Sequence, residues 1–242
     1  MNLPDFLLIG ETKSGTTSLF NYLIKHPQIL DTFGNGDVVD KIYLTKEIRF
    51  FDRYYHKGIE WYKSCFPETK TNEITGEATP MYMYRSMIPF RVKKHLPNSK
   101  FIVLLRNPVD RLYSNFQHYY KWVPNWAKQY PTFEVYLDSC NDRDYFMIEK
   151  GLYFSTLQKW LKFFPRDQFF IESTENLSSN PQKIYSNVLN FLCVDDFIIN
   201  DFKIFRENEY KIMKKQTRNL LEEFYKPHNE DLYRFLNHDL NW

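Results

Sequence analysis

The chain opens with an apolar run that is followed by a helical pattern. Phe6 to Ile9 form the run, Gly10 bounds it, and apolar side chains then recur at helical spacing at Leu19, Leu23 and Ile24. A short apolar run that ends at glycine and passes into a 3.6-residue period predicts a buried strand, a tight loop and a helix. This order of elements is typical of a phosphate-binding loop.

Strand-like and helix-like patterns then alternate along the chain. The clearest strand is the continuous apolar run from Lys100 to Arg106, typical of a strand buried on both faces of a parallel sheet. Further strand-like runs lie at 74–80 and 168–172, and helical patterns lie at 58–66, 88–96, 108–116, 145–164, 181–192, 220–225 and 231–236. The alternation predicts right-handed βαβ units and an α/β fold. We expect a P-loop-like three-layer α/β/α arrangement with a central parallel sheet, in a single domain that covers 1–242.

Composition limits the classes of partner. With 43% hydrophobic and 19% aromatic residues, the 242-residue chain can bury a substantial core. Its 32 basic and 30 acidic residues give a formal net charge of only +2. No global field therefore recruits nucleic acid or an acidic membrane surface, and any anion site must be local.

Cysteine usage and the apolar runs bear on the compartment. The three cysteines, Cys65, Cys140 and Cys193, are odd in number and far apart, which argues against a disulfide framework and fits a reducing compartment. The sequence shows no signal-peptide pattern and no apolar stretch near 18 residues. We expect a cytoplasmic protein without a membrane partner, and the sequence does not indicate its oligomeric state.

The first loop carries candidate chemistry for binding an anion. Gly10 and Gly15 keep the six-residue spacing of the nucleotide-triphosphate loop, but that motif has lysine after its second glycine. Thr16 stands there instead, and Lys13 lies inside the loop. Backbone N–H groups and the positive end of the helix meet at such a loop, where hydroxyls can cap the helix or bind phosphate oxygens. The binding candidates are Lys13, Ser14, Gly15, Thr16, Thr17 and Ser18.

A second candidate site follows the strongest strand. Arg106 stands at its carboxyl end, where ligands bind in open α/β sheets, and Ser114 lies two turns into the next helix. A guanidinium can hold a phosphate through two hydrogen bonds and a serine can add a third, which suits a 3′-phosphate on a ribose. Taken alone, Arg106 is equally well explained as a salt-bridged strand end. Asp110 and Arg111 are expected to form a surface pair on this helix.

These motifs together resemble a known family. The run from Lys13 to Ser18 resembles the 5′-phosphosulfate loop of sulfotransferases that use 3′-phosphoadenylyl sulfate (PAPS), and the run from Leu104 to Phe116 resembles their 3′-phosphate motif. Within that family, Lys46 to Phe51 and Tyr55 to Tyr62 resemble elements of the heparan-sulfate (N-/3-O-) sulfotransferase type. Segments 76–82, 160–165 and 240–242 add to a resemblance that covers essentially the whole chain, and it implies a bacterial member.

The resemblance implies a mechanism and assigns its residues. Lys13 would stabilise the bridging oxygen of the leaving adenosine 3′,5′-bisphosphate without a metal. Glu47 would be the general base that takes the acceptor proton, with His118 as the rival base. Arg49 and Asp52 would line the acceptor site.

Two departures from the family pattern affect the acceptor. Ala78 stands where heparan-type enzymes commonly have lysine, and the family's C-terminal cofactor loop has no clear counterpart. Arg206, or the cluster Lys211, Lys214 and Lys215, is the candidate replacement for the basic contact of that loop. With the low net charge, these losses argue against a long polyanionic acceptor and favour a small metabolite or a bacterial glycan.

Two other classes remain open. A P-loop nucleotide or small-molecule kinase would have lysine at position 16 and an aspartate at the end of a strand. A non-catalytic protein that holds a nucleotide or glycan on the same fold would be expected to lose Lys13 or Glu47, and both are present. The acceptor, and whether oxygen or nitrogen is sulfated, cannot be predicted from the sequence.

Overall fold

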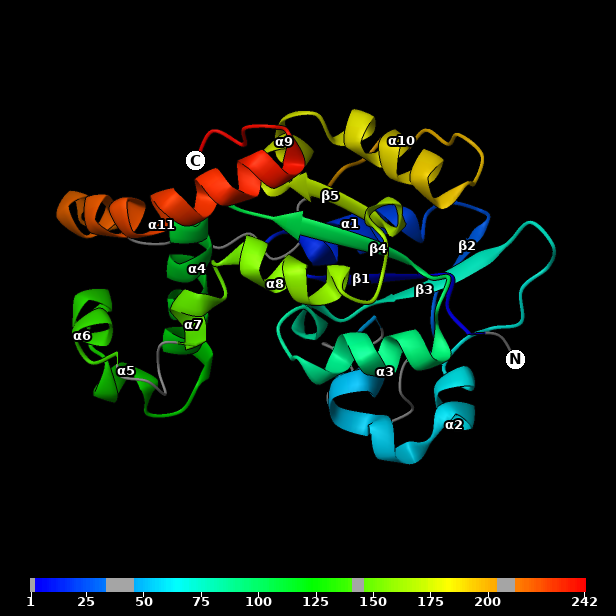
Figure 1. Ribbon diagram of the computed structural model, residues 1–242, viewed down its shortest axis with the longest axis horizontal. Helices are drawn as coiled ribbons and strands as arrows, with labels where there is room; N and C mark the ends of the chain where they lie inside the picture. Colours follow the sequence, from blue (N-terminus) through cyan, green and yellow to red (C-terminus); the bar gives the residue numbers. More distant parts are fainter. Residues whose placement is uncertain (1–2, 34–45, 141–145, 204–211) are drawn as a thin grey trace. The chain divides into compact units, whose positions relative to one another are not determined.

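The computed structural model describes residues 3–33, 46–140, 146–203 and 212–242 (Figure 1). The chain forms two compact units, each described separately below. The first contains Met1–Leu105 and Lys159–Arg206, and the second contains Arg106–Gln158 and Glu207–Trp242. The boundary thus falls directly after the strongest predicted strand.

The first unit is built on a five-stranded parallel sheet. Its order is β2-β3-β1-β4-β5, and every neighbouring pair of strands is parallel. The strands are β1 (Phe6–Gly10), β2 (Ile29–Leu30), β3 (Ile74–Ala78), β4 (Lys100–Leu105) and β5 (Phe169–Ser173). The predicted α/β class with a central parallel sheet is therefore confirmed. Because all strands run the same way, the loops that follow them meet at one edge of the sheet.

Helices cover both faces of this sheet, as a sheet buried on two sides requires. Phe6, Leu8, Ile102 and Leu104 contribute to one core with the apolar faces of α1 (Thr16–Leu23) and α10 (Pro181–Leu192). Phe101 lies on the opposite face, where its ring centroid is 5.2 Å from that of Trp160. The other helical segments of this unit are η1 (Phe50–Tyr54), η2 (Tyr55–Lys57), α2 (Ile59–Lys63), η3 (Pro80–Tyr82), α3 (Met87–His95), η4 (Arg166–Gln168) and α9 (Thr174–Ser179).

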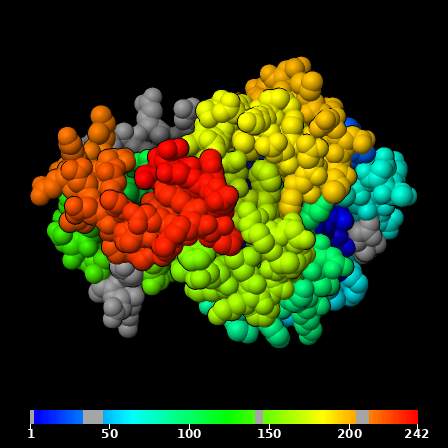
Figure 2. All heavy atoms as spheres, turned by 45° about the horizontal axis from the view of Figure 1, so that its top comes forward, coloured from blue at the N-terminus to red at the C-terminus, as the bar shows by residue number. Residues whose placement is uncertain are grey.

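The part of the second unit that the structure describes is helical. It contains α4 (Pro108–Trp122), α5 (Trp126–Gln129), α6 (Phe133–Asp138), α7 (Phe146–Glu149), most of α8 (Tyr153–Leu161) and α11 (Lys215–Leu236). Its core joins Leu112 and Phe116 of α4 to Tyr136 of α6 and Tyr225 of α11. The C-terminal residues, red in Figure 2, lie at the surface, where the Trp242 backbone N–H donates to the Tyr233 hydroxyl at 3.0 Å.

Two predicted helix boundaries are wrong in this unit. The single pattern predicted over 145–164 is divided into α7 and α8 around Gly151, where a Cβ would lie 2.5 Å from the Tyr225 ring. The two short helices predicted near the C-terminus are one helix, α11, with Pro227 inside it. Proline removes one helical hydrogen bond, but the buried side chains of α11 on both sides of it stabilise the continuous helix.

The predicted surface pair of Asp110 and Arg111 is also wrong. Arg111 is fully buried and donates from Nη2 to the Met147 carbonyl at 2.5 Å. Asp110 instead forms an ion pair with Arg218 of α11, with 2.5 Å between Nη2 and Oδ1. Consecutive helical positions point about 100° apart, so they rarely form a pair with each other.

Candidate active site

The loop between β1 and α1 has the geometry of an anion site. Gly15 has φ of 76° and is the N-cap of α1, and no side chain caps this helix end. A left-handed φ strongly favours glycine, which explains why glycine occurs here. The helix therefore begins at Thr16, as predicted, and its uncapped first turn carries the partial positive charge that attracts anions.

Backbone and side-chain hydrogen bonds hold this loop in place. Thr174 Oγ1, at the start of α9, lies 2.8 Å from both the Ser14 and the Leu105 carbonyl oxygens. The Glu11 N–H donates to the Leu104 carbonyl at 2.8 Å, and the buried Glu11 carboxylate accepts from Thr12 and Tyr84. The loop is thus fixed to the carboxyl ends of β4 and β5 before any ligand binds.

The hydroxyls of the loop differ in their surroundings. Ser14 Oγ is buried and has no hydrogen-bond partner among the described residues, as expected of a group whose partner is a ligand oxygen. Thr16 is buried and Thr17 is half-buried in the first turn of α1. Ser18 is buried and hydrogen-bonds to Tyr22 one turn later, so its hydroxyl also serves the packing of α1. This donor set fits the phosphate oxygens of a nucleotide.

Glu47 lies at the same sheet edge, beside the end of β3. The Ala78 N–H donates to the Lys46 carbonyl at 2.9 Å, which attaches this segment to the strand. Lys46 Nζ is 3.4 Å from both Glu47 Oε1 and the Ala78 carbonyl oxygen. The Lys46 side chain is nearly buried, whereas 20% of the Glu47 side chain is exposed. The Glu47 carboxylate is therefore both oriented by a cation and accessible.

The two predicted acceptor residues, Arg49 and Asp52, bind each other. Arg49 Nη2 lies 2.5 Å from Asp52 Oδ2, and Arg49 Nε lies 3.2 Å from the same oxygen. Only 1% of the Asp52 side chain is exposed, against 25% of the Arg49 side chain. Of the two, the guanidinium is thus the group open to a ligand.

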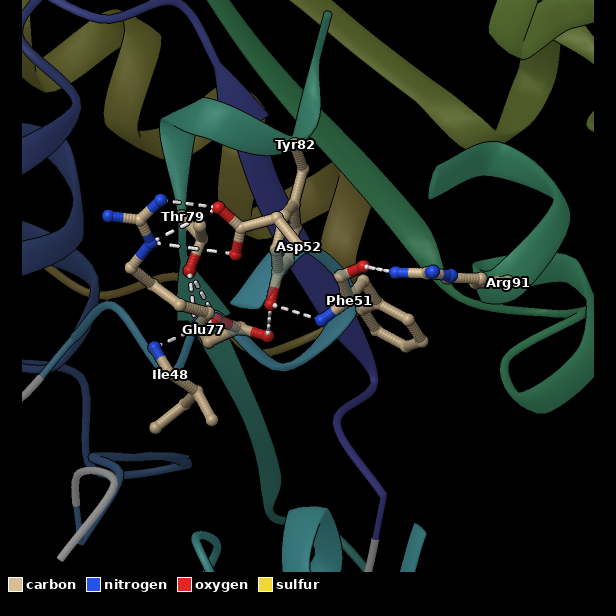
Figure 3. Close-up of polar contacts among 8 residues, drawn as sticks. Ile48, Phe51, Asp52, Glu77, Thr79, Tyr82 and Arg91 are labelled. Atoms are coloured by element: carbon tan, nitrogen blue, oxygen red, sulfur yellow. Dashed lines mark hydrogen bonds and ion pairs between the residues drawn. The ribbon is translucent and has the colours of Figure 1, made fainter. Parts of the chain in front are cut away.

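A buried carboxyl that the sequence did not single out lies behind this segment (Figure 3). Glu77 of β3 is fully buried and accepts hydrogen bonds from Tyr62, Thr79, Tyr82 and the backbone of Ile48. Burial raises the pKa of the Glu77 carboxyl to about 7, and these four donors oppose the rise. The only signal in the sequence was a charged residue inside an otherwise uncharged strand.

Arg106, Ser114 and His118 belong to the second unit. Arg106 directly follows β4, and its carbonyl accepts from the Tyr153 hydroxyl at 2.7 Å. Ser114 is buried on α4, and His118 is half-buried one turn later on the same helix. The Asn107 side chain caps α4 by accepting from the Val109 and Asp110 N–H groups. Arg206 and Lys211 lie outside the described residues.

A parallel sheet, with a glycine-containing loop and an uncapped helix end after its first strand, is the arrangement of P-loop-like α/β proteins, in which this loop is the usual place for a phosphate group. The sulfotransferase domain family matches residues 3–227, and the chain belongs to this family. The predicted family, and the PAPS donor that it uses, are thereby confirmed.

Relatives and a solved structure agree with this family. The chain is 28% identical to the human bifunctional heparan sulfate N-deacetylase/N-sulfotransferase 2, over 97% of this chain and 29% of that protein. It is 28% identical to the mouse heparan sulfate glucosamine 3-O-sulfotransferase 3B1, over 99% of this chain and 65% of that protein. The chain thus spans less than two thirds of either relative. The fold matches the crystal structure of a sulfotransferase from Alicyclobacillus acidocaldarius with a TM-score of 0.77 and 22% identity, over 99% of this chain and 98% of that one.

The predicted cytoplasmic location stays a prediction. Among the residues that the structure describes, no helix combines the length and the apolar character needed to cross a membrane.

Proposed function

We propose that the protein transfers the sulfuryl group of PAPS to a hydroxyl or amine of a small metabolite or a glycan. The observation that carries this proposal is the position of two loops at one sheet edge. The loop after β1 presents an uncapped helix end and a buried Ser14 hydroxyl that has no partner in the described part of the chain. Glu47 lies beside the end of β3, the strand next to β1. One loop suits a phosphosulfate, and the other supplies a carboxylate that can accept a proton.

The proposed binding residues divide between the 5′-phosphosulfate and the 3′-phosphate of PAPS. PAPS supplies an activated sulfuryl group, and its 5′-phosphosulfate is held by Lys13, by the hydroxyls of the loop and by the N–H groups of the first turn of α1. Lys13 stabilises the negative charge that grows on the leaving oxygen. Arg106, Ser114 and Arg206 bind the 3′-phosphate side of the nucleotide. The product is adenosine 3′,5′-bisphosphate.

The proposed removal of the acceptor proton depends on Glu47 and the residues around it. Glu47 takes the proton from the acceptor as the oxygen or nitrogen attacks sulfur, and Lys46, 3.4 Å away, orients the carboxylate for this step. Arg49 contacts the acceptor, and Asp52 fixes the guanidinium through their ion pair. His118 is the second candidate base, because histidine is the commonest general base in enzymes.

The acceptor is proposed from charge. The relatives named above act on heparan sulfate according to their names, but this chain has a net charge of only +2 and has alanine at position 78. Lys46 places an ammonium group near position 78, where its Nζ lies 3.4 Å from the Ala78 carbonyl oxygen. The same Nζ lies 3.4 Å from Glu47, so the carboxylate offsets its charge. We therefore favour an acceptor with little or no negative charge over a long polyanion.

The test is transfer of labelled sulfate from ³⁵S-PAPS to three probes: a glucosamine tetrasaccharide with free amines, its N-acetylated form and a simple phenol. Lys13→Ala is expected to lose turnover by at least 100-fold while it keeps most of its affinity for the bisphosphate. Glu47→Gln is expected to lose a similar factor in kcat. The matched controls, Lys70→Ala and Glu60→Gln, change exposed residues and should keep the wild-type rate. A wild-type rate in Glu47→Gln would refute the assigned base.

A further inference from the structure

Glu77 presents its buried carboxyl to the segment that carries the proposed base. It lies in β3 opposite Leu7 of β1, and it has no exposed surface, so it cannot touch a bound acceptor. An ionisable group in such a place is costly unless several partners compensate it. Four do so: the Tyr62 and Tyr82 hydroxyls reach Oε1 at 2.6 and 2.9 Å, and the Thr79 hydroxyl and the Ile48 N–H reach Oε2 at 2.6 and 3.1 Å.

Hydrogen bonds connect the Glu77 carboxyl to the backbone of residues 48–51, directly or through the Thr79 and Tyr82 hydroxyls (Figure 3). The Ile48 N–H donates to Glu77 directly. Thr79 Oγ1 accepts from the Arg49 N–H at 3.3 Å, and Tyr82 Oη accepts from the Phe51 N–H at 3.3 Å. A hydroxyl has one proton, so donating it to Glu77 turns the oxygen lone pairs toward these N–H groups. Three N–H groups of one short segment therefore depend on one carboxyl.

This segment needs such support because its conformation is unusual. Arg49 has φ of 57°, a left-handed value that residues other than glycine rarely adopt, and η1 begins directly after it. A separate contact, from Arg91 Nη1 to the Phe51 carbonyl at 2.7 Å, fixes the end of the segment but not its start. The start is the part adjacent to Glu47, and there Glu77 and Thr79 receive the backbone N–H groups.

We propose that Glu77 is a positioning residue for sulfuryl transfer, which fixes the backbone of residues 48–51 and so holds Glu47 where it can take the acceptor proton. This inference rests on the proposed function, and in particular on Glu47 as the base. Glu77 acts through Glu47 and does not exchange a proton with the acceptor.

The test compares Glu77→Gln with a matched control on the same strand. Glutamine keeps the shape of the side chain, but its NH₂ group cannot accept hydrogen bonds, so one pair of donors loses its partner. Thr75→Val is the control: Thr75 is equally buried on the same face of β3, and its hydroxyl bonds to the Leu30 carbonyl at 3.1 Å, away from residues 48–51. Both variants remove hydrogen bonds of a buried side chain, but only Glu77 bonds to residues 48–51.

Two measurements read the outcome. In Glu77→Gln we expect amide hydrogen exchange of residues 48–51 to accelerate at least tenfold and kcat with the preferred probe above to fall at least tenfold, while affinity for adenosine 3′,5′-bisphosphate stays within twofold. Thr75→Val should show neither effect. Because Glu77 acts through Glu47, adding Glu77→Gln to Glu47→Gln should reduce kcat no further.

The outcomes that overturn the inference differ from those that refute the proposed function. Unchanged exchange of residues 48–51 in Glu77→Gln, or a loss of kcat that adds in full to that of Glu47→Gln, would overturn the positioning role. A wild-type protein that neither binds the bisphosphate nor transfers the label would refute the proposed function instead. The exchange measurement needs no turnover, so it distinguishes the two cases.

Discussion

Replacing Glu77 by glutamine should change how the stability of the protein depends on pH. Burial raises the pKa of this carboxyl from an ordinary 4.5 to about 7 in the folded state. Between these two values the folded protein binds a proton at Glu77 that the unfolded chain does not bind. This proton therefore makes its full contribution to the free energy of unfolding below about pH 4.5, and the contribution is lost as the pH rises through 7. An ion-paired carboxylate shows the opposite trend, because its contribution is lost as the pH falls.

The magnitude follows from the gap between the two pKa values. At about 1.4 kcal/mol per pH unit the full effect is about 3.5 kcal/mol, and the part lost between pH 5 and pH 8 is about 2.5 kcal/mol. For a protein of this size, that corresponds to about 5–10 °C in Tm. Glutamine does not titrate, so Glu77→Gln lacks this contribution while all other groups still titrate.

Scanning calorimetry of both proteins at pH 5, 6, 7 and 8 measures the effect as a difference. The Tm of the wild type minus that of Glu77→Gln should be largest at pH 5 and should decrease steadily toward pH 8. Thr75→Val should differ from the wild type by the same amount at every pH. A difference between wild type and Glu77→Gln that does not vary with pH would refute the raised pKa of Glu77.

Three further substitutions test the two loops. Gly15→Ala places a Cβ at φ of 76°, which should cost about 1–2 kcal/mol of stability in thermal unfolding and weaken bisphosphate binding in calorimetry; an unchanged Tm would contradict the left-handed conformation. Thr174→Val removes the hydroxyl beside the Ser14 and Leu105 carbonyls and should weaken bisphosphate binding about fivefold, whereas Thr174→Ser should bind as the wild type does. Lys46→Met should lower kcat in the ³⁵S assay at unchanged bisphosphate affinity, because Lys46 contacts Glu47; a loss of affinity alone would place Lys46 on the nucleotide side.

Local patterns explain why much of the first unit could be predicted. The apolar runs at Phe6 and Lys100 are strands, and the pattern at 181–192 is the helix α10 with Pro181 in its first turn, as expected of a residue that needs no helical N–H partner. The loop between β1 and α1 could be placed because glycine, lysine and hydroxyl residues occur together at fixed spacing. These features depend on residues close in sequence, so a single sequence contains them.

The errors and omissions depend on residues far apart in the chain. Arg111 was expected at the surface, but the Met147 carbonyl, 36 residues later, provides the buried acceptor for its guanidinium. Two short helices were expected at 220–225 and 231–236, but tertiary packing keeps α11 continuous through Pro227. The role proposed for Glu77 could not be predicted, because it depends on hydrogen bonds with Tyr62, Tyr82 and the segment after Glu47. Only the folded chain brings these residues together.

The roles predicted for the residues near the carboxyl ends of the strands stay predictions. Lys13 lies in the loop after β1, Glu47 and Arg49 lie in the segment beside β3, and the contacts of Glu47 and Arg49 are consistent with their proposed roles. The roles of Arg106, Ser114, His118 and Arg206 stay predictions from the family resemblance.

Calorimetric titration with adenosine 3′,5′-bisphosphate, compared with ATP and AMP, tests the central claim most directly. A PAPS-dependent sulfotransferase should bind the bisphosphate at least 100-fold more tightly than ATP, and Arg106→Ala should remove most of that preference, since a guanidinium on the 3′-phosphate distinguishes these nucleotides. Tighter binding of ATP, with no effect of Arg106→Ala, would contradict the account and favour a nucleotide or small-molecule kinase on the same fold.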